Sequence, residues 1–139
     1  MKNVIIDTGP IVALFDKDDK YHKTAVKFFK DFQDRLITTW PVVTEVSYML
    51  NFNVKAQCSF FEWIRLHAVS IYDIRNDHVK DIINLLSRYS NVPMDLADAS
   101  ILLVAEEKGI SDILSFDSDY YIYKLNKKKT FNNLLNGHY

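Results

Sequence analysis

The sequence contains little of what marks secreted, membrane-bound or zinc-binding proteins. Its only cysteine, Cys58, cannot form an intrachain disulfide, which agrees with a reducing compartment. Because Cys58 lies beside the apolar residues Phe60 and Phe61, we expect a packed thiol. No apolar run approaches the ~18 residues of a membrane span, and the N-terminus lacks a signal peptide. We therefore expect a soluble, cytoplasmic protein that does not associate with a membrane.

The histidines do not have the pattern of metal ligands. His22, His67, His78 and His138 are scattered without ligand-like spacing and have no cysteine partners, so a zinc site is not expected. Any bound metal would therefore need oxygen ligands.

Acidic residues are missing from the C-terminal part of the chain. The net charge is only −1, yet the segment from Tyr120 to Tyr139 contains no acid. It does contain Lys124, Lys127, Lys128 and Lys129. A basic segment can contact phosphates, but solvated surface lysines are more common, so it is weak support for nucleic-acid binding.

The chain does contain enough apolar material for one domain over residues 1–139. It is 48% hydrophobic and 14% aromatic, and no internal repeat or linker divides it. Strands are expected near residues 4–6, 36–39, 68–72 and 112–115, alternating with helices near 11–15, 22–32, 42–50, 55–66, 77–89 and 95–108. This alternation predicts an α/β fold, a three-layer α/β/α sandwich with a central, mainly parallel sheet.

Asp7 follows the apolar run of residues 4–6, which has the pattern of a parallel strand buried on both faces. Gly9 and Pro10 end this strand. The functional crevice of open α/β sheets lies outside the carboxyl ends of the strands, so Asp7 is placed where chemistry usually happens. The alternative is structural, because Asp7 or Thr8 could cap the helix that Pro10 begins.

Glu45 lies in a predicted helix, close to its apolar face. Val42, Val46 and Met49 occupy positions i−3, i+1 and i+4 from it, so the carboxylate shares or borders that face. An acid there costs free energy unless it is paired, hydrogen-bonded or bound to a metal. The alternative is that Glu45 extends into solvent beside Thr44.

Asp95 and Asp98 open a predicted helix that is apolar almost all round and ends at Gly109. Their spacing imitates a capping box, and acids in the first turn are favoured by the helix dipole. This explanation accounts well for Asp95. It accounts less well for Asp98, because Ile101 and Leu102 lie at i+3 and i+4 from it. A buried helix that points both acids the same way places them at the wall of a pocket.

Asp117 and Asp119 follow the last predicted strand, so carboxylates again arrive at a strand end. Like charges packed together repel and raise one another's pKa unless a cation neutralises them. Mg²⁺ or Mn²⁺ resolves the repulsion, because these ions take oxygen ligands and substrate phosphates. We therefore predict metal-assisted hydrolysis of phosphodiester bonds.

Four acidic segments together resemble the motifs of PIN-domain ribonucleases. They are Val4-Ile5-Ile6-Asp7-Thr8-Gly9-Pro10, Glu45 in its helix, Met94-Asp95-Leu96-Ala97-Asp98-Ala99-Ser100, and Ser115-Phe116-Asp117-Ser118-Asp119-Tyr120. Their order and spacing are specific as a set, and the resemblance covers nearly the whole chain. The last segment keeps a hydroxyl, two acids and an aromatic ring where the family often has Thr-x-Asp-x-Asp-Phe.

The chain looks most similar to the small prokaryotic VapC-type toxins of toxin–antitoxin pairs. The resemblance implies a Mg²⁺- or Mn²⁺-dependent endoribonuclease whose catalytic, metal-binding acids are Asp7, Glu45, Asp98 and Asp117. Candidate additional site residues are Asp95, Asp119, Thr8 and Ser115. The resemblance also implies an RNA substrate, a homodimer and an antitoxin protein partner. Aromatic residues around Phe60, Phe61 and Trp63 likewise indicate an interface.

Three alternatives share parts of this pattern. Asp7-Thr8-Gly9 also occurs in aspartic proteases, but that class needs an almost all-β chain. A phospho-accepting receiver domain needs a pair of acids at its first strand, and this chain has one there. The serious alternative is a catalytically inactive PIN-like domain that binds RNA or protein. Retention of all four acids favours the enzyme, and a metal titration separates the two.

Overall fold

A computed structural model describes residues 1–126 and 128–139, and Lys127 of the lysine-rich segment lies outside them. The main sheet has five parallel strands in the order β3-β2-β1-β4-β7. These are β1 (Asn3–Ile6), β2 (Arg35–Thr39), β3 (Val69–Tyr72), β4 (Asp112–Leu114) and β7 (Asn132–Asn133). The predicted central parallel sheet is confirmed.

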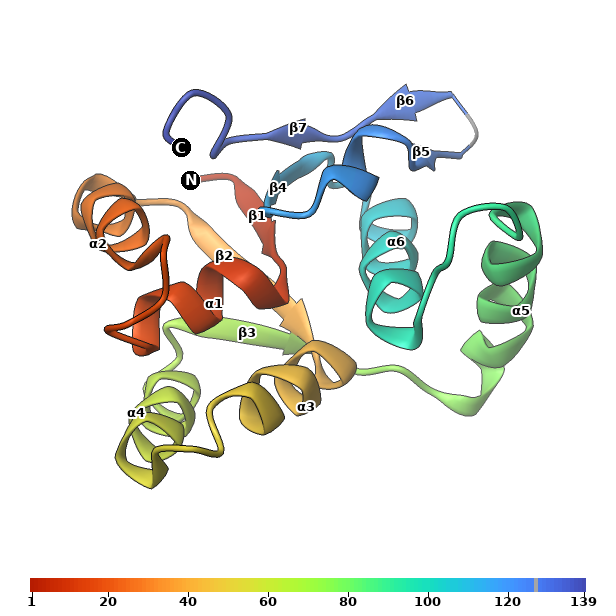
Figure 1. Ribbon diagram of the computed structural model, residues 1–139. Helices are drawn as coiled ribbons and strands as arrows, with labels where there is room; N and C mark the ends of the chain where they lie inside the picture. The colour runs from red at the N-terminus through yellow and green to blue at the C-terminus, as the bar shows by residue number, and fades with distance from the viewer. Residues whose placement is uncertain (127) are drawn as a thin grey trace.

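Helices cover both faces of this sheet (Figure 1). They are α1 (Thr8–Phe15), α2 (His22–Asp31), α3 (Trp40–Met49), α4 (Val54–Arg65), α5 (Val79–Arg88) and α6 (Leu96–Lys108). Helices α1, α2 and α4 lie on one side and α5 and α6 on the other, while α3 contacts both α1 and α6. This arrangement confirms the predicted α/β class with three layers.

The core is built around β1 and α6. The three apolar residues of β1 are fully buried, as expected for a central strand covered on both faces. Almost every residue of α6 from Ala97 to Ala105 is buried. Gly109 ends α6 in the left-handed conformation (φ 66°), as the predicted glycine cap requires. The elements that carry Asp7 and Asp98 are therefore anchored in the core.

The C-terminal segment forms strands that the sequence analysis did not predict. β5 (Lys124–Leu125) and β6 (Lys129–Thr130) make an antiparallel hairpin, and β7 extends the main sheet beside β4. Each strand has two residues, too few for alternation to reveal. Asn133 of β7 is buried, and its side-chain amide is hydrogen-bonded to the backbone of Ser115. Its Oδ1 accepts the N–H of Ser115 (3.3 Å), and its Nδ2 donates to the carbonyl of Ser115 (2.8 Å).

Two side chains lie differently from the sequence-based expectation. Cys58 is exposed, so the prediction of a packed thiol was wrong. Phe60, two residues further along α4, is fully buried, and residues two apart point to different sides of a helix. Met49, the last residue of α3, is half exposed and does not extend the apolar face beside Glu45.

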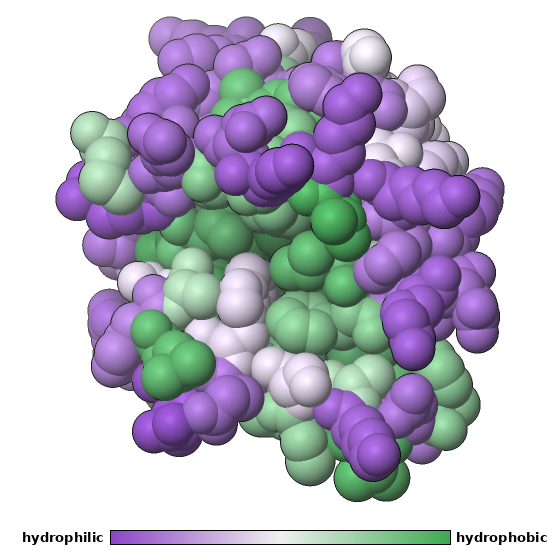
Figure 2. Space-filling view, turned by 90° about the vertical axis from the view of Figure 1, so that its left-hand side faces the viewer, coloured by the Kyte–Doolittle hydropathy of each residue, from purple (hydrophilic) through white to green (hydrophobic). Residues whose placement is uncertain are grey.

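The side of the molecule that carries α1, α2 and α4 has apolar surface gathered between polar regions (Figure 2). At α4, Val54 and Phe61 and the following Leu66 are exposed. In the part of the chain that the structure describes, no helix has the length and apolar character needed to cross a membrane.

Candidate active site

The carboxyl ends of β1 and β4 mark the natural place for a site in this sheet. The chain proceeds from β1 through β2 to β3 on one side, whereas β4 and β7 lie on the other. Ligands of open α/β sheets bind outside the strand ends at such a reversal. Asp7 directly follows β1 there, and its backbone N–H donates to the carbonyl of Leu114 at the end of β4 (3.0 Å).

The carboxylate of Asp7 is buried and does not cap α1. Asp7 occupies the N-cap position but makes no side-chain bond to the helix, so capping does not explain its side chain. Instead, the Ser115 hydroxyl donates to its Oδ2 (3.0 Å), and only 6% of the residue is exposed. Burial raises the pKa of Asp7 to about 7, and the charges of Asp98 and Asp117 add to this rise.

Glu45 approaches the same region through Thr8. The Thr8 hydroxyl donates to Oε1 of Glu45 (2.7 Å) and joins the start of α1 to α3. Burial raises the pKa of Glu45, and interactions with Asp95 and the charge of Asp117 raise it further. Because the carboxylate bonds Thr8, it does not extend away into solvent, which was the alternative.

Helix α6 contributes two acids with different contacts. Asp95 is the N-cap, and its carboxylate accepts the backbone N–H of Asp98 (2.9 Å). The side chain of Asp98 instead accepts the hydroxyls of Tyr120 (3.2 Å) and Tyr123 (3.5 Å). Burial raises the pKa of Asp98 to about 7, and the charges of Asp95 and Asp117 add to the rise. The capping explanation therefore holds for Asp95 and leaves Asp98 free for chemistry.

The segment after β4 adds Asp117 and Asp119. The Ser115 hydroxyl accepts the backbone N–H of Asp117 (2.9 Å) while it donates to Asp7, so one buried hydroxyl links two acids. Asp117 caps the short turn η2 (Ser118–Tyr121) by accepting the N–H of Asp119 (2.9 Å). Burial and then the charge of Asp117 raise the pKa of Asp119.

The predicted acids therefore share one region of the molecule. The charge of Asp117 raises the pKa of Asp7, Glu45 and Asp98 alike. These acids come from four separate segments of the sequence and meet only at the carboxyl end of the sheet.

Buried hydroxyls hold the surrounding elements in place. The Thr38 hydroxyl donates to the carbonyl of Ile6 (2.8 Å) and ties β2 to β1. The hydroxyls of Thr39 and Ser100 are 2.6 Å apart and tie the start of α3 to α6. The two helices that carry acids are consequently fixed against each other.

Sequence reasoning missed the contact from Tyr120. Tyr120 was interpreted only as the aromatic residue of the last motif, where the related family often has phenylalanine. Phenylalanine lacks the hydroxyl that donates to Asp98, so this departure was the available signal. Asn133, which holds the backbone of Ser115, had no comparable signal because it lies between Phe131 and Leu134 in a segment without alternation.

Comparison with known proteins identifies the family and the fold of this chain. A family model of the PIN domain matches residues 4–127, a segment that contains all of the predicted acids. The chain belongs to the PIN-domain family. The crystal structure of VapC20 from Mycobacterium tuberculosis, described as a sarcin-ricin loop cleaving toxin, superimposes on this PIN domain with a TM-score of 0.74. The match covers 84% of this chain and 91% of that one at 24% sequence identity, which shows a common fold. No curated protein matches the sequence significantly.

The site acids, which are Asp7, Glu45, Asp95, Asp98, Asp117 and Asp119, form no ion pair among the described residues. The ion pairs between these residues all involve other carboxylates. In the same residues, no group of three or more His, Cys, Asp or Glu side chains is arranged to hold a metal ion by itself. Mg²⁺ commonly uses one or two carboxylates together with waters and substrate phosphates. The donor set therefore fits a hard divalent cation shared with a phosphate, and not one enclosed by protein alone.

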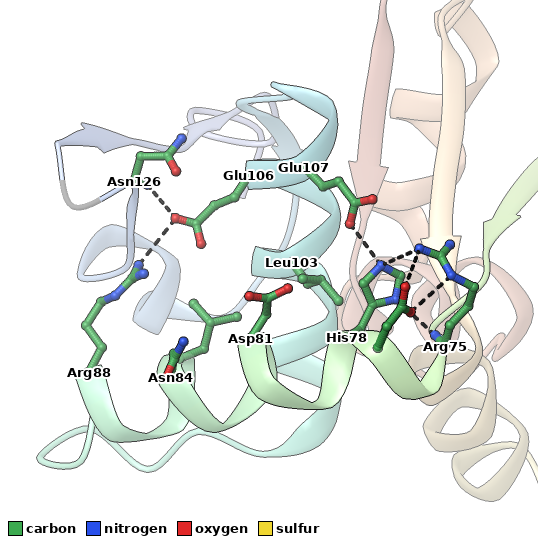
Figure 3. A pocket seen from close by; sticks show the side chains of 11 residues that line it. Arg75, His78, Asp81, Asn84, Arg88, Leu103, Glu106, Glu107 and Asn126 are labelled. Carbon is green, nitrogen blue, oxygen red and sulfur yellow. Dashed lines mark hydrogen bonds and ion pairs between the residues drawn. The ribbon is translucent and has the colours of Figure 1, made fainter.

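A cavity of about 540 Å³ between α5 and α6 contains none of these acids (Figure 3). Each of its basic side chains lies beside an acid of the same cavity. His78 lies 3.1 Å from Glu107, and Arg88 lies 3.3 Å from Glu106. Nδ1 of His78 also accepts the backbone N–H of Arg75 (2.9 Å). Because its cations are already neutralised, the size of this cavity does not make it a phosphate site.

Proposed function

We propose that this PIN domain is a metal-dependent endoribonuclease and the toxin of a toxin–antitoxin pair. Its cofactor would be Mg²⁺ or Mn²⁺, its substrate RNA and its location the cytoplasm. The observation that carries the proposal is the convergence of Asp7, Asp98 and Asp117, whose charges repel one another without a cation among the described residues. Family membership supports it, as does the fold shared with a toxin described as cleaving the sarcin-ricin loop.

Carboxylate oxygens from the set Asp7, Glu45, Asp98 and Asp117 would hold the metal together with waters and phosphate oxygens of the RNA. When bound, such an ion neutralises the carboxylates and the phosphate and lowers the pKa of an attacking water. Without neutralisation, the acids would repel the negatively charged RNA backbone. Their joint presence therefore supports a site that takes up a cation.

The neighbouring hydroxyl groups would orient the acids. Ser115 donates to Asp7, Thr8 donates to Glu45, and Tyr120 donates to Asp98. Each bond occupies part of a carboxylate and leaves other lone pairs for an ion. Groups that hydrogen-bond to metal ligands and orient them typically contribute 10- to 100-fold to metal affinity or activity.

The test is incubation of purified protein with single-stranded and structured RNAs in Mg²⁺, in Mn²⁺ and in EDTA. We expect cleavage in at least one metal and none in EDTA. Asp98→Asn should abolish cleavage. Asp18→Asn is the matched control, because Asp18 is exposed between α1 and α2 and its charge is not among those that shift the pKa of Asp7 or Asp98. If clean, folded protein cuts no RNA in any divalent metal, the enzyme proposal fails.

We further propose a homodimer and an antitoxin protein that inhibits it. The exposed Val54, Phe61 and Leu66 at α4 support a protein interface, because contiguous apolar surface usually marks one. An antitoxin arginine would pair bidentately with the site carboxylates. Light scattering over a range of concentrations and co-purification with a small neighbouring gene product test both points. A strict monomer at high concentration, with no such neighbour, would contradict them.

A catalytically inactive PIN-like domain that binds RNA or protein is the second candidate. It is favoured by the fact that no three potential ligands in the described residues are arranged to hold a metal alone. Calorimetric titration with Mg²⁺ and Mn²⁺, with and without RNA, separates the candidates. Saturable metal binding that Asp98→Asn weakens supports the enzyme. RNA binding that no metal influences supports the binding module.

A further inference from the structure

A shallow apolar groove opens directly beside the acids. Its volume is about 420 Å³, and it is lined by Trp40, Pro41, Thr44, Glu45, Asp95, Leu96 and Ala97. Glu45 and Asp95 thus line the groove and also belong to the acidic region. We call this feature the Trp40 groove.

Two large apolar side chains of the Trp40 groove are exposed. Trp40 is the first residue of α3 and Leu96 the first of α6, and they are 49% and 53% exposed. The residues just before them, Thr39 and Asp95, are the N-caps of these helices. The hydrogen bond between the hydroxyls of Thr39 and Ser100, which ties α3 to α6, therefore also helps to fix the positions of Trp40 and Leu96.

The charge of the Trp40 groove decides which part of a nucleotide can enter it. None of the described residues that line it is a lysine, an arginine or a histidine, and two are acids. A phosphate would be repelled here and has no donor of positive charge. A nucleobase is uncharged and planar, and bases of single-stranded RNA stack on aromatic side chains. The groove therefore suits a base and excludes the backbone.

We propose that Trp40 stacks on an unpaired base of the RNA next to the phosphodiester bond that is cut. This inference rests on the proposed nuclease function, because a metal ion held by the acids beside the groove would engage the phosphate. Stacking on an indole is tolerant of base identity. Trp40 thus selects for single-stranded or flipped-out nucleotides over paired ones, and acts as a specificity-determining residue.

The first measurement is binding, which does not depend on cleavage. The protein has two tryptophans, and Trp63 is partly buried and packs edge-on against Phe15. The double variant Trp63→Phe, Asp98→Asn reports on Trp40 alone and leaves the RNA intact. A short single-stranded RNA of mixed sequence should quench its fluorescence saturably in Mg²⁺, and the same RNA annealed to its complement should not. Absence of quenching by bound single-stranded RNA would overturn the proposal.

The second measurement is cleavage by variants of Trp40 in the otherwise unchanged protein. Trp40→Ala should lower kcat/KM by about 5- to 150-fold on single-stranded RNA, the range expected for one stacked base. Trp40→Phe should retain most of the rate. Phe52→Ala is the control, because Phe52 is an exposed aromatic residue that lines neither this groove nor the cleft on the other side of Trp40.

An abasic nucleotide, moved step by step through the RNA, locates the stacked base. At one position it should slow the parent enzyme as much as Trp40→Ala does, and the variant should lose nothing further there. If the parent cuts RNA while Trp40→Ala cuts at the same rate, the stacking proposal is wrong and the nuclease proposal stands. If no protein cuts RNA but single-stranded RNA still quenches Trp40, the nuclease proposal fails and the groove remains an RNA site. Loss of dimerisation with unchanged cleavage would assign Trp40 to a protein interface instead.

Discussion

Replacement of Asp7 by asparagine should make the metal-free protein more stable at alkaline pH. The asparagine side chain keeps the size of the aspartate and an oxygen that can accept the Ser115 hydroxyl. The replacement removes a charge that is buried and lies near the charges of Asp98 and Asp117. Asp7→Asn therefore separates the cost of the charge from the packing of the site.

The sign and size of the effect follow from the pKa of Asp7. Its pKa is about 7 in the folded protein and 3.8 in the absence of the fold. Between these values the folded state binds more protons than the unfolded state, so the free energy of unfolding decreases as pH rises from about 4 to 7. Above pH 7 the decrease in the free energy of unfolding is complete. At 1.36 kcal/mol per pKa unit, it reaches at most about 4 kcal/mol. Asparagine does not titrate and escapes this loss.

Thermal melts in EDTA at pH 4, 6 and 8 measure the difference. The parent and Asp7→Asn should melt together at pH 4, and the variant should melt higher by up to roughly 14 °C at pH 8. In Mg²⁺ the advantage should shrink or reverse, because an ion that binds the folded parent stabilises it. Asp18→Asn should follow the parent at each pH, since an exposed charge contributes little.

A variant that melts lower than the parent at pH 8 in EDTA would refute this reasoning. It would mean that the charged Asp7 is stabilised by the fold and not penalised by it. An advantage that stays constant from pH 4 to pH 8 would equally contradict the assigned cause, because titration of Asp7 could not produce it.

Three further predictions concern single contacts. Asp98→Asn should leave stability in EDTA equal or higher, reduce stabilisation by Mg²⁺ and abolish cleavage; lower stability with cleavage at the parental rate would remove Asp98 from the site. Tyr120→Phe should fold normally and lose about 10- to 100-fold in kcat/KM, because it removes the hydroxyl that orients Asp98; an unchanged rate would show that this bond is dispensable. Phe60→Ala should cost about 3–5 kcal/mol in denaturant unfolding, whereas Phe61→Ala, at a 41% exposed position, should cost about 1 kcal/mol or less; equal costs would contradict the assigned burial.

The order of elements could be predicted because it depends on local patterns. The apolar run before Asp7 was long enough to identify a buried parallel strand, and the structure places it at the centre of the sheet. The helix from Leu96 to Lys108 was marked at both ends, by the Asp95 cap and by Gly109. A cap and a left-handed glycine act within one helical turn, so the sequence alone specifies them.

Side-chain direction was predicted less well where a helix has apolar residues on several sides. α4 carries Phe60, Phe61 and Trp63, and the pattern did not show which of them would face the core. Packing against Phe15 buried Phe60 and left Cys58 exposed on another side of the helix. Which side chains of α4 are buried therefore depends on the residues of other elements that pack against this helix.

The sequence by itself determined which residues of this protein could do chemistry: acids at strand ends and on helix faces, in an order that resembles a nuclease family. Only the tertiary structure decided how they are connected. The hydroxyl of Ser115 reaches Asp7 from the far end of the chain, and Tyr120 reaches Asp98 from a different element. Such bonds leave no periodic signal, because they depend on where parallel strands end relative to one another and not on the spacing of neighbours along the chain.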